Sequence, residues 1–124
     1  MDESAPLIAV GIVAFFLAVA GVLMIWLAWA GRTGRLGRNM FVGIRTSATL
    51  SSDTAWHAAH RTSAAYTVSA GVGALAGAVA TLAIRSTGAL VVAVVATSVW
   101  MLVWVAVGAF VGTRAARRAD TQTG

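Results

Sequence analysis

The chain has 124 residues, of which 59% are hydrophobic and 10% are charged, and its net charge of +5 comes from arginine without any lysine. Such a composition is too apolar for an ordinary soluble domain and indicates a membrane protein. Because cysteine is absent, neither disulfides nor a thiolate metal site are expected. A basic chain can bind nucleic acid, but no soluble domain is present to carry such a face, so we expect no nucleic-acid partner.

The first apolar run covers residues 6–30 and is long enough to cross a hydrocarbon core of roughly 30 Å as a helix. A signal peptide is the competing interpretation, but it would need a basic N-terminal region and a shorter apolar core. The residues before this run include Asp2 and Glu3 instead. We therefore expect a retained membrane span.

Two further apolar runs, residues 63–84 and 89–111, are separated by a short polar turn. Backbone polar groups in lipid must be satisfied within the segment, so both runs are predicted to be helices that form a tight antiparallel hairpin. The second run contains one G-x-x-x-G pair, Gly73 with Gly77, and a second pair, Gly108 with Gly112, stands at the end of the third run. Such pairs permit close helix packing. We expect these pairs to pack within one chain rather than to form a dimer seam. No ionisable residue lies well inside a span, which argues against an ion pump or an ion-coupled transporter.

The distribution of arginine predicts the orientation of the three spans. Five of the nine arginines lie in residues 31–62 and three lie in the tail, residues 112–124, whereas Arg85 alone lies in the turn between the second and third spans. Positively charged loops stay in the cytoplasm, so we expect the N-terminus outside and the C-terminus inside. The same arginines predict attraction to anionic lipid head groups.

Residues 31–62 hold the only cluster of chemically distinctive side chains. Ser51 is a good N-cap with Asp53 in the first turn, so a short amphipathic helix is predicted to start near residue 52 and to lead into the second span. On it Asp53, His57 and His60 share one face, as two imidazoles and a carboxylate do in some zinc sites. The alternative is an Asp–His pair on a polar face. No nucleophile can be placed beside these residues, so we assign no catalytic residue, metal or cofactor.

Arg45 and Trp56 invite a structural hypothesis. A guanidinium at the membrane surface can bind a carboxylate, a phosphate or helix-end carbonyls. We expect Arg45 to tie its turn to the capped helix, through Asp53 or nearby backbone carbonyls, and direct ligand binding is the alternative. Trp56 is expected to anchor that helix at the membrane interface.

The order Asn39-x-x-x-Gly43-Ile44-Arg45-Thr46, Thr49-Leu50-Ser51 and Asp53-x-x-Trp56-x-x-x-His60-Arg61 resembles the SdpI family of bacterial membrane proteins. The family's founding member is an immunity protein, so the resemblance implies a role in immunity, in signalling or as an accessory subunit. The matching positions are signature and binding candidates: Asn39, Gly43, Arg45, Thr46, Thr49, Asp53, Trp56, His60 and Arg61.

Together these features predict an all-α membrane protein, one membrane domain over residues 1–124 with a cytoplasmic interfacial segment between its first two spans. We expect it in the bacterial inner membrane, acting by binding a membrane protein or peptide rather than as an enzyme. Two alternatives remain. One is a membrane-embedded enzyme that acts on lipid head groups through Asp53, His57 and His60. The other is a purely structural subunit of a membrane complex.

Overall fold

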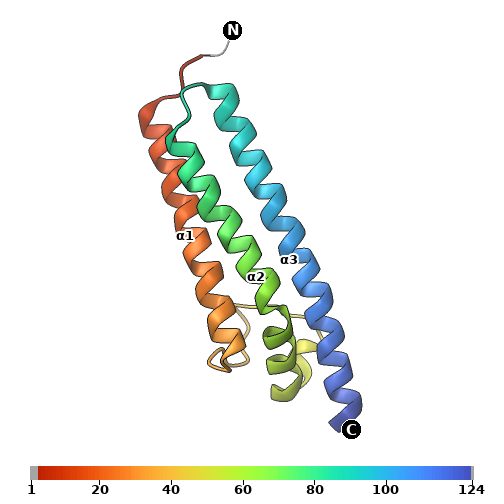
Figure 1. The fold of residues 1–124 in the computed structure, drawn as a ribbon. Helices are drawn as coiled ribbons and strands as arrows, with labels where there is room; N and C mark the ends of the chain where they lie inside the picture. The colour runs from red at the N-terminus through yellow and green to blue at the C-terminus, as the bar shows by residue number, and fades with distance from the viewer. Residues whose placement is uncertain (1–2, 124) are drawn as a thin grey trace.

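The structure is a computed structural model that describes residues 3–123. It contains three long helices, α1 (Leu7–Arg32), α2 (Asp53–Leu82) and α3 (Thr87–Thr123), and a short 3₁₀ helix, η1 (Thr49–Ser51). The long helices lie side by side, and α2 packs against both α1 and α3 (Figure 1). All three are long and apolar enough to cross a membrane, which confirms the predicted all-helical, multi-pass architecture.

The bundle is packed largely through its small residues, and many of its large apolar side chains face outward. A Cβ on Gly21 would lie 2.9 Å from the carbonyl oxygen of Gly71, so the backbones of α1 and α2 approach closely there. Across the other seam, Gly73 faces Trp100 and Gly77 faces Thr97. Gly73 and Gly77 therefore pack within the chain, as predicted.

The outward-facing side chains fit a lipid environment. They include Phe16 on α1, Val79 on α2 and Leu102 on α3, which are 64%, 71% and 68% exposed. In water so much apolar surface would be unfavourable, whereas in a bilayer it faces hydrocarbon. The apolar surface of the bundle therefore agrees with the length of its helices.

The predicted hairpin is present, and the N-terminal segment pairs with its turn. α2 ends at Leu82 and α3 starts at Thr87. The amide of Ala5 donates to the carbonyl of Arg85 at 3.0 Å, and the amide of Thr87 donates to the carbonyl of Glu3 at 2.8 Å. Both bonds fix the N-terminal segment to this end of the bundle.

The structure changes two of the expected helix boundaries. Ser52, rather than Ser51, is the N-cap of α2, because its Oγ accepts the amide of Ala55 at 3.0 Å. The expected short helix is the first part of α2 and leads directly into the second span, as predicted. The basic tail is also helical, since α3 continues to Thr123.

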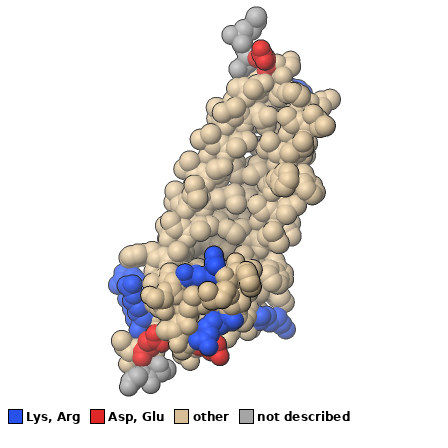
Figure 2. All heavy atoms as spheres, turned by 180° about the vertical axis from the view of Figure 1, so that it is seen from behind, with Lys and Arg blue, Asp and Glu red and all other residues tan. Residues whose placement is uncertain are grey.

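Charged side chains are concentrated at one end of the molecule. Figure 2 shows Lys/Arg and Asp/Glu side chains gathered at the end that includes the C-terminus, with an uncharged body between the two ends. The last turn of α1, the segment joining α1 to α2 and the end of α3 all lie at this charged end (Figure 1). The arginines of residues 31–62 and of the tail therefore share one side of the bundle.

Candidate functional site at the charged end

The connecting segment, residues 33–52, crosses from α1 to η1, which contacts both α2 and α3 (Figure 1). Its first turn closes α1: the amides of Arg35 and Leu36 both donate to the carbonyl of Ala30, at 2.8 and 3.0 Å. Gly34 makes this turn with a φ of 77°, a conformation that suits glycine. Leu36 is thereby turned into the bundle, where it is buried.

Trp56 is fully buried, so the prediction that it anchors the helix at the membrane interface is wrong. Its indole Nε1 donates to the carbonyl of Leu36 at 2.7 Å, and the ring packs against Leu36 and Ala30. A buried indole needs a partner for its N–H, and the turn after α1 supplies it. Trp56 therefore holds the connecting segment against α2 from within.

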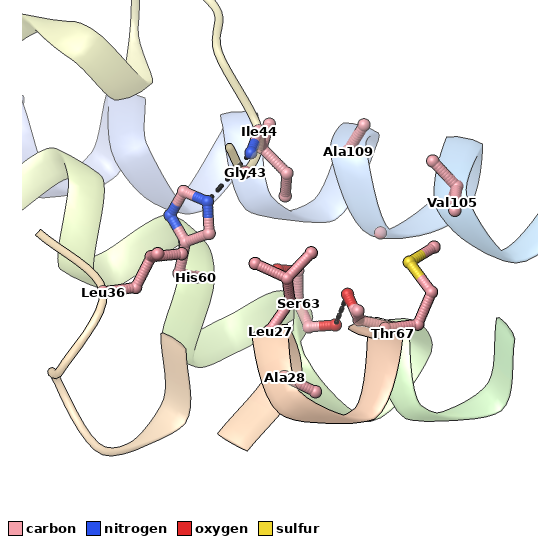
Figure 3. A pocket seen from close by; sticks show the side chains of 12 residues that line it. Leu27, Ala28, Leu36, Gly43, Ile44, His60, Ser63, Thr67, Val105 and Ala109 are labelled. Atoms are coloured by element: carbon pink, nitrogen blue, oxygen red, sulfur yellow. Dashed lines mark hydrogen bonds between the residues drawn. The ribbon is translucent and has the colours of Figure 1, made fainter. Parts of the chain in front are cut away.

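His60 lies one helical turn after Trp56 and is 6% exposed. Its Nε2 lies 2.9 Å from the amide nitrogen of Ile44 (Figure 3). Its Nδ1 lies 2.8 Å from the carbonyl oxygen of Trp56. Because the amide must donate, Nε2 accepts, and Nδ1 carries the proton that goes to the carbonyl. Both ring nitrogens are therefore used by backbone groups, and the ring is neutral.

The surroundings of His60 agree with a neutral ring. His60 precedes the apolar part of α2, which starts at Ser63. Burial lowers the pKa of the imidazole below 6.5; the hydrogen bond to the Trp56 carbonyl raises it, and the nearby His57 lowers it further. The ring also packs on Trp56, with centroids 4.2 Å apart. A buried neutral imidazole with two backbone partners is suited to a structural role.

Gly43 allows the Gly-Ile-Arg-Thr turn to lie directly on this ring. Its φ is 106°, and a Cβ added there would lie 2.5 Å from Nε2 of His60. Gly31, at the end of α1, is similarly constrained, since its Cβ would lie 2.9 Å from the Cβ of His60. Two glycines distant in sequence thus make room for one imidazole.

Thr46 and Thr49 close the other end of the turn. The amide of Thr46 donates to Oγ1 of Thr49 at 2.9 Å, and the amide of Thr49 donates to Oγ1 of Thr46 at 3.2 Å. Oγ1 of Thr49, which is fully buried, donates to the carbonyl of Ile44 at 2.7 Å. Ile44 is therefore held through both its amide and its carbonyl.

Asn39 and Arg45 shape the stretch before the turn. Oδ1 of Asn39 accepts the amides of Phe41 and Val42, each at 2.8 Å, and its Nδ2 donates to the carbonyl of Gly37 at 2.9 Å. The Arg45 guanidinium donates to the carbonyl of Met40. Arg45 thus bonds a backbone carbonyl of its own segment, and not the helix that we expected it to reach.

These bonds present three neighbouring apolar side chains to the outside, and we call these three residues the loop tip. Met40, Phe41 and Val42 are 64%, 87% and 39% exposed. A tip whose backbone is fixed by side-chain hydrogen bonds loses little conformational freedom when it binds. The loop tip is therefore the preorganised, outward-facing part of the segment.

The remaining candidates, Asp53, His57 and Arg61, lie on the first part of α2. Asp53 is exposed and pairs with Arg38, whose Nε lies 3.4 Å from Oδ1. Arg61 is exposed, whereas Nδ1 of His57 is buried and has no hydrogen-bond partner in the described part of the chain. Among residues 3–123, no three His, Cys, Asp or Glu side chains come together as a metal site would require. The shared helical face of Asp53, His57 and His60 thus does not bring their side chains together.

Residues 35–113 match the model of the SdpI/YfhL protein family. The chain belongs to this family. The match covers almost all of the connecting segment, the whole of α2 and most of α3. No curated protein and no solved structure matched the chain.

The family's matched region also encloses most of a half-open cavity of about 140 Å³ beneath the turn (Figure 3). All three long helices and the connecting segment contribute to its wall. The lining is mostly apolar, with hydroxyls from Ser63 and Thr67 and an edge of the His60 ring. Sequence reasoning missed it, because residues such as Gly108 and Ala109 mark a cavity only once the helices are placed.

Proposed function

We propose that this SdpI-family protein acts by binding a protein or peptide partner at the cytoplasmic face of the bacterial inner membrane, with the loop tip as its contact. The observation that carries the proposal is the exposure of Phe41, 87%, on a backbone fixed by Asn39 and Arg45. An exposed aromatic ring on a fixed backbone is a common anchor of protein–protein contacts. An immunity, signalling or accessory role is compatible with this contact.

The arrangement of His60 and Asp53 supports binding over catalysis. A general base needs a ring nitrogen or carboxylate that can reach a substrate proton. Both nitrogens of His60 already bond backbone groups, and the Asp53 carboxylate pairs with Arg38. A lipid-cleaving enzyme that used these residues would first have to dismantle the turn.

The arginines of residues 31–62 and of the tail lie at the same end of the bundle, and this supports the predicted orientation in the membrane. The connecting segment and the end of α3 lie at the same end of the bundle (Figures 1 and 2). The positive-inside tendency then favours this end in the cytoplasm, with the N-terminus outside. The loop tip accordingly faces cytoplasmic partners.

Comparative purification tests the proposal. The tagged chain would be crosslinked in native membranes and purified beside Phe41→Ser and a control, Leu7→Ser. Leu7 is 82% exposed but lies at the start of α1, away from the charged end. We expect one stoichiometric partner with the wild type and with Leu7→Ser, and its loss with Phe41→Ser. Equal recovery with all three proteins would refute the loop tip as the contact.

A further inference from the structure

A second feature of the charged end is a shallow pocket between α2 and α3, of about 130 Å³. α2 contributes Thr62, and α3 contributes the remaining lining residues, Phe110, Val111, Arg114, Ala115 and Arg118. It contains none of the loop-tip residues. Its lining joins two guanidinium groups and a hydroxyl to an aromatic ring.

The two arginines of this pocket are available to a ligand. Both are exposed, and among residues 3–123 neither guanidinium forms an ion pair or a hydrogen bond. Arg114 instead lies over the ring of Phe110, 5.6 Å from its centroid. That contact orients the Arg114 guanidinium and leaves its N–H donors unused. Two unpaired guanidinium groups beside a hydroxyl match the acceptor oxygens of a phosphate.

The pocket continues an apolar stripe of α3. Val103, Val107, Phe110, Arg114 and Arg118 follow one another at three- and four-residue intervals, so they share one face of the helix. The first three are 51%, 36% and 64% exposed. Along this face the surface changes from apolar to basic within a single turn.

The place where the surface of α3 changes from apolar to basic agrees with the edge of a bilayer. The apolar run before it, residues 89–111, would span roughly 34 Å as a helix, close to a hydrocarbon thickness of roughly 30 Å. Arg114 and Arg118 then lie at head-group depth, while Phe110 lies beside the first part of the acyl chains. This depth applies whichever face of the membrane the charged end occupies.

We propose that Thr62, Arg114 and Arg118 bind the phosphate of an anionic phospholipid, whose acyl chain lies along the apolar stripe of α3. A phospholipid fits better than free phosphate, because the pocket opens onto exposed Phe110 and the stripe below it. The bound lipid would hold the first part of α2 to α3 at the membrane surface. This lipid site is independent of the proposed contact at the loop tip.

Native mass spectrometry of the purified, delipidated full chain tests the site. Phosphatidylglycerol and phosphatidylcholine with identical acyl chains would be titrated separately. We expect a preference for phosphatidylglycerol in the wild type. The double variant Arg114→Gln/Arg118→Gln should weaken phosphatidylglycerol binding by roughly tenfold or more, as expected for losing two cationic contacts near a membrane surface.

A matched control removes the same charge elsewhere. Arg32→Gln/Arg117→Gln changes two exposed arginines that do not line the pocket, and it should retain wild-type affinity. Equal weakening by both double variants would overturn the site in favour of a diffuse charge effect. Displacement of the lipid by an equal concentration of inorganic phosphate would overturn the lipid assignment. Equal binding of the two lipids to the wild type would also overturn it.

Discussion

The amide of Ile44 donates a hydrogen bond to Nε2 of His60 across 2.9 Å, and this bond joins the connecting segment to the second helix. Sixteen residues separate the two groups in the sequence. The same ring bonds the carbonyl of Trp56 through its other nitrogen. His60 is thus a bridge between the turn and α2, and its replacement should loosen the charged end.

His60→Ala should lower the free energy of unfolding by about 2–4 kcal/mol, because it leaves a cavity and an unpaired, partly buried amide on Ile44. Thermal unfolding in detergent measures the change. His57→Ala is the matched control, since Nδ1 of His57 has no partner to lose, and it should cost less than about 1 kcal/mol. Equal losses in the two variants would contradict the bridge.

The same ring predicts how stability depends on pH. Burial lowers the pKa of His60 in the folded protein below its usual 6.5, so the unfolded chain takes up the proton first. Stability is therefore full above pH 6.5 and is lost as the pH falls from 6.5 towards the folded value. Melting temperatures between about pH 8 and 5 test this. His60→Gln should flatten the profile, and an unchanged profile in that variant would assign the dependence to another group.

Gly43→Ala should destabilise the protein by about 1–3 kcal/mol and disturb the Ile44–His60 bond, since φ is 106° and the new Cβ would meet Nε2. Gly37→Ala provides the control, because nothing lies within 4 Å of a Cβ there. Its melting temperature should stay at or slightly above that of the wild type. If Gly43→Ala were equally harmless, the turn could not lie on the ring as described.

Trp56→Phe removes the indole N–H and leaves the Leu36 carbonyl without its donor, which should cost about 1–3 kcal/mol. Trp26→Phe serves for comparison, because Trp26 is 51% exposed on α1 and should change stability by less than about 0.5 kcal/mol. Chemical or thermal unfolding of both variants in one detergent separates them. An effect of Trp56→Phe no larger than that of Trp26→Phe would contradict the buried hydrogen bond of Trp56.

Much of the fold could be predicted from the sequence, because apolar runs and polar turns act locally. The three spans follow from run length, and the hairpin follows from the short polar stretch around Arg85. The sequence did not predict that the tail after residue 111 is helical, because its polar side chains do not follow the apolar pattern of a membrane span. The choice of Ser52 over Ser51 as N-cap likewise depends on one local turn, η1, which the sequence does not specify.

The candidate site was predictable as a set of residues but not as a set of contacts. Gly43 and His60 were both singled out, yet their packing depends on how residues 33–52 cross the bundle. The sequence placed Trp56 at the membrane interface instead of in the core. A buried indole needs an acceptor for its N–H, and only the tertiary structure shows that the Leu36 carbonyl supplies it. Arg38, which pairs with Asp53, was interpreted only as one of a group of basic residues.

The orientation can be tested cleanly, because the chain contains no cysteine. Ser4→Cys and Thr121→Cys place one thiol at each end of the bundle, in exposed positions. We expect a membrane-impermeant maleimide to label position 4 in cells whose outer envelope is permeabilised and whose inner membrane is closed. Position 121 should be labelled only after the inner membrane is disrupted. The reverse pattern would place the loop tip outside the cell.

Site-specific photocrosslinking at position 41 gives the most direct test of whether the loop tip binds a protein partner. A photoreactive phenylalanine derivative would replace Phe41 in one protein and Phe16, which faces outward from α1, in another. After illumination of native membranes, we expect position 41 to give one discrete protein adduct and position 16 to give lipid adducts. Lipid adducts alone at position 41 would contradict binding through the loop tip, and would show that Phe41 inserts into the bilayer.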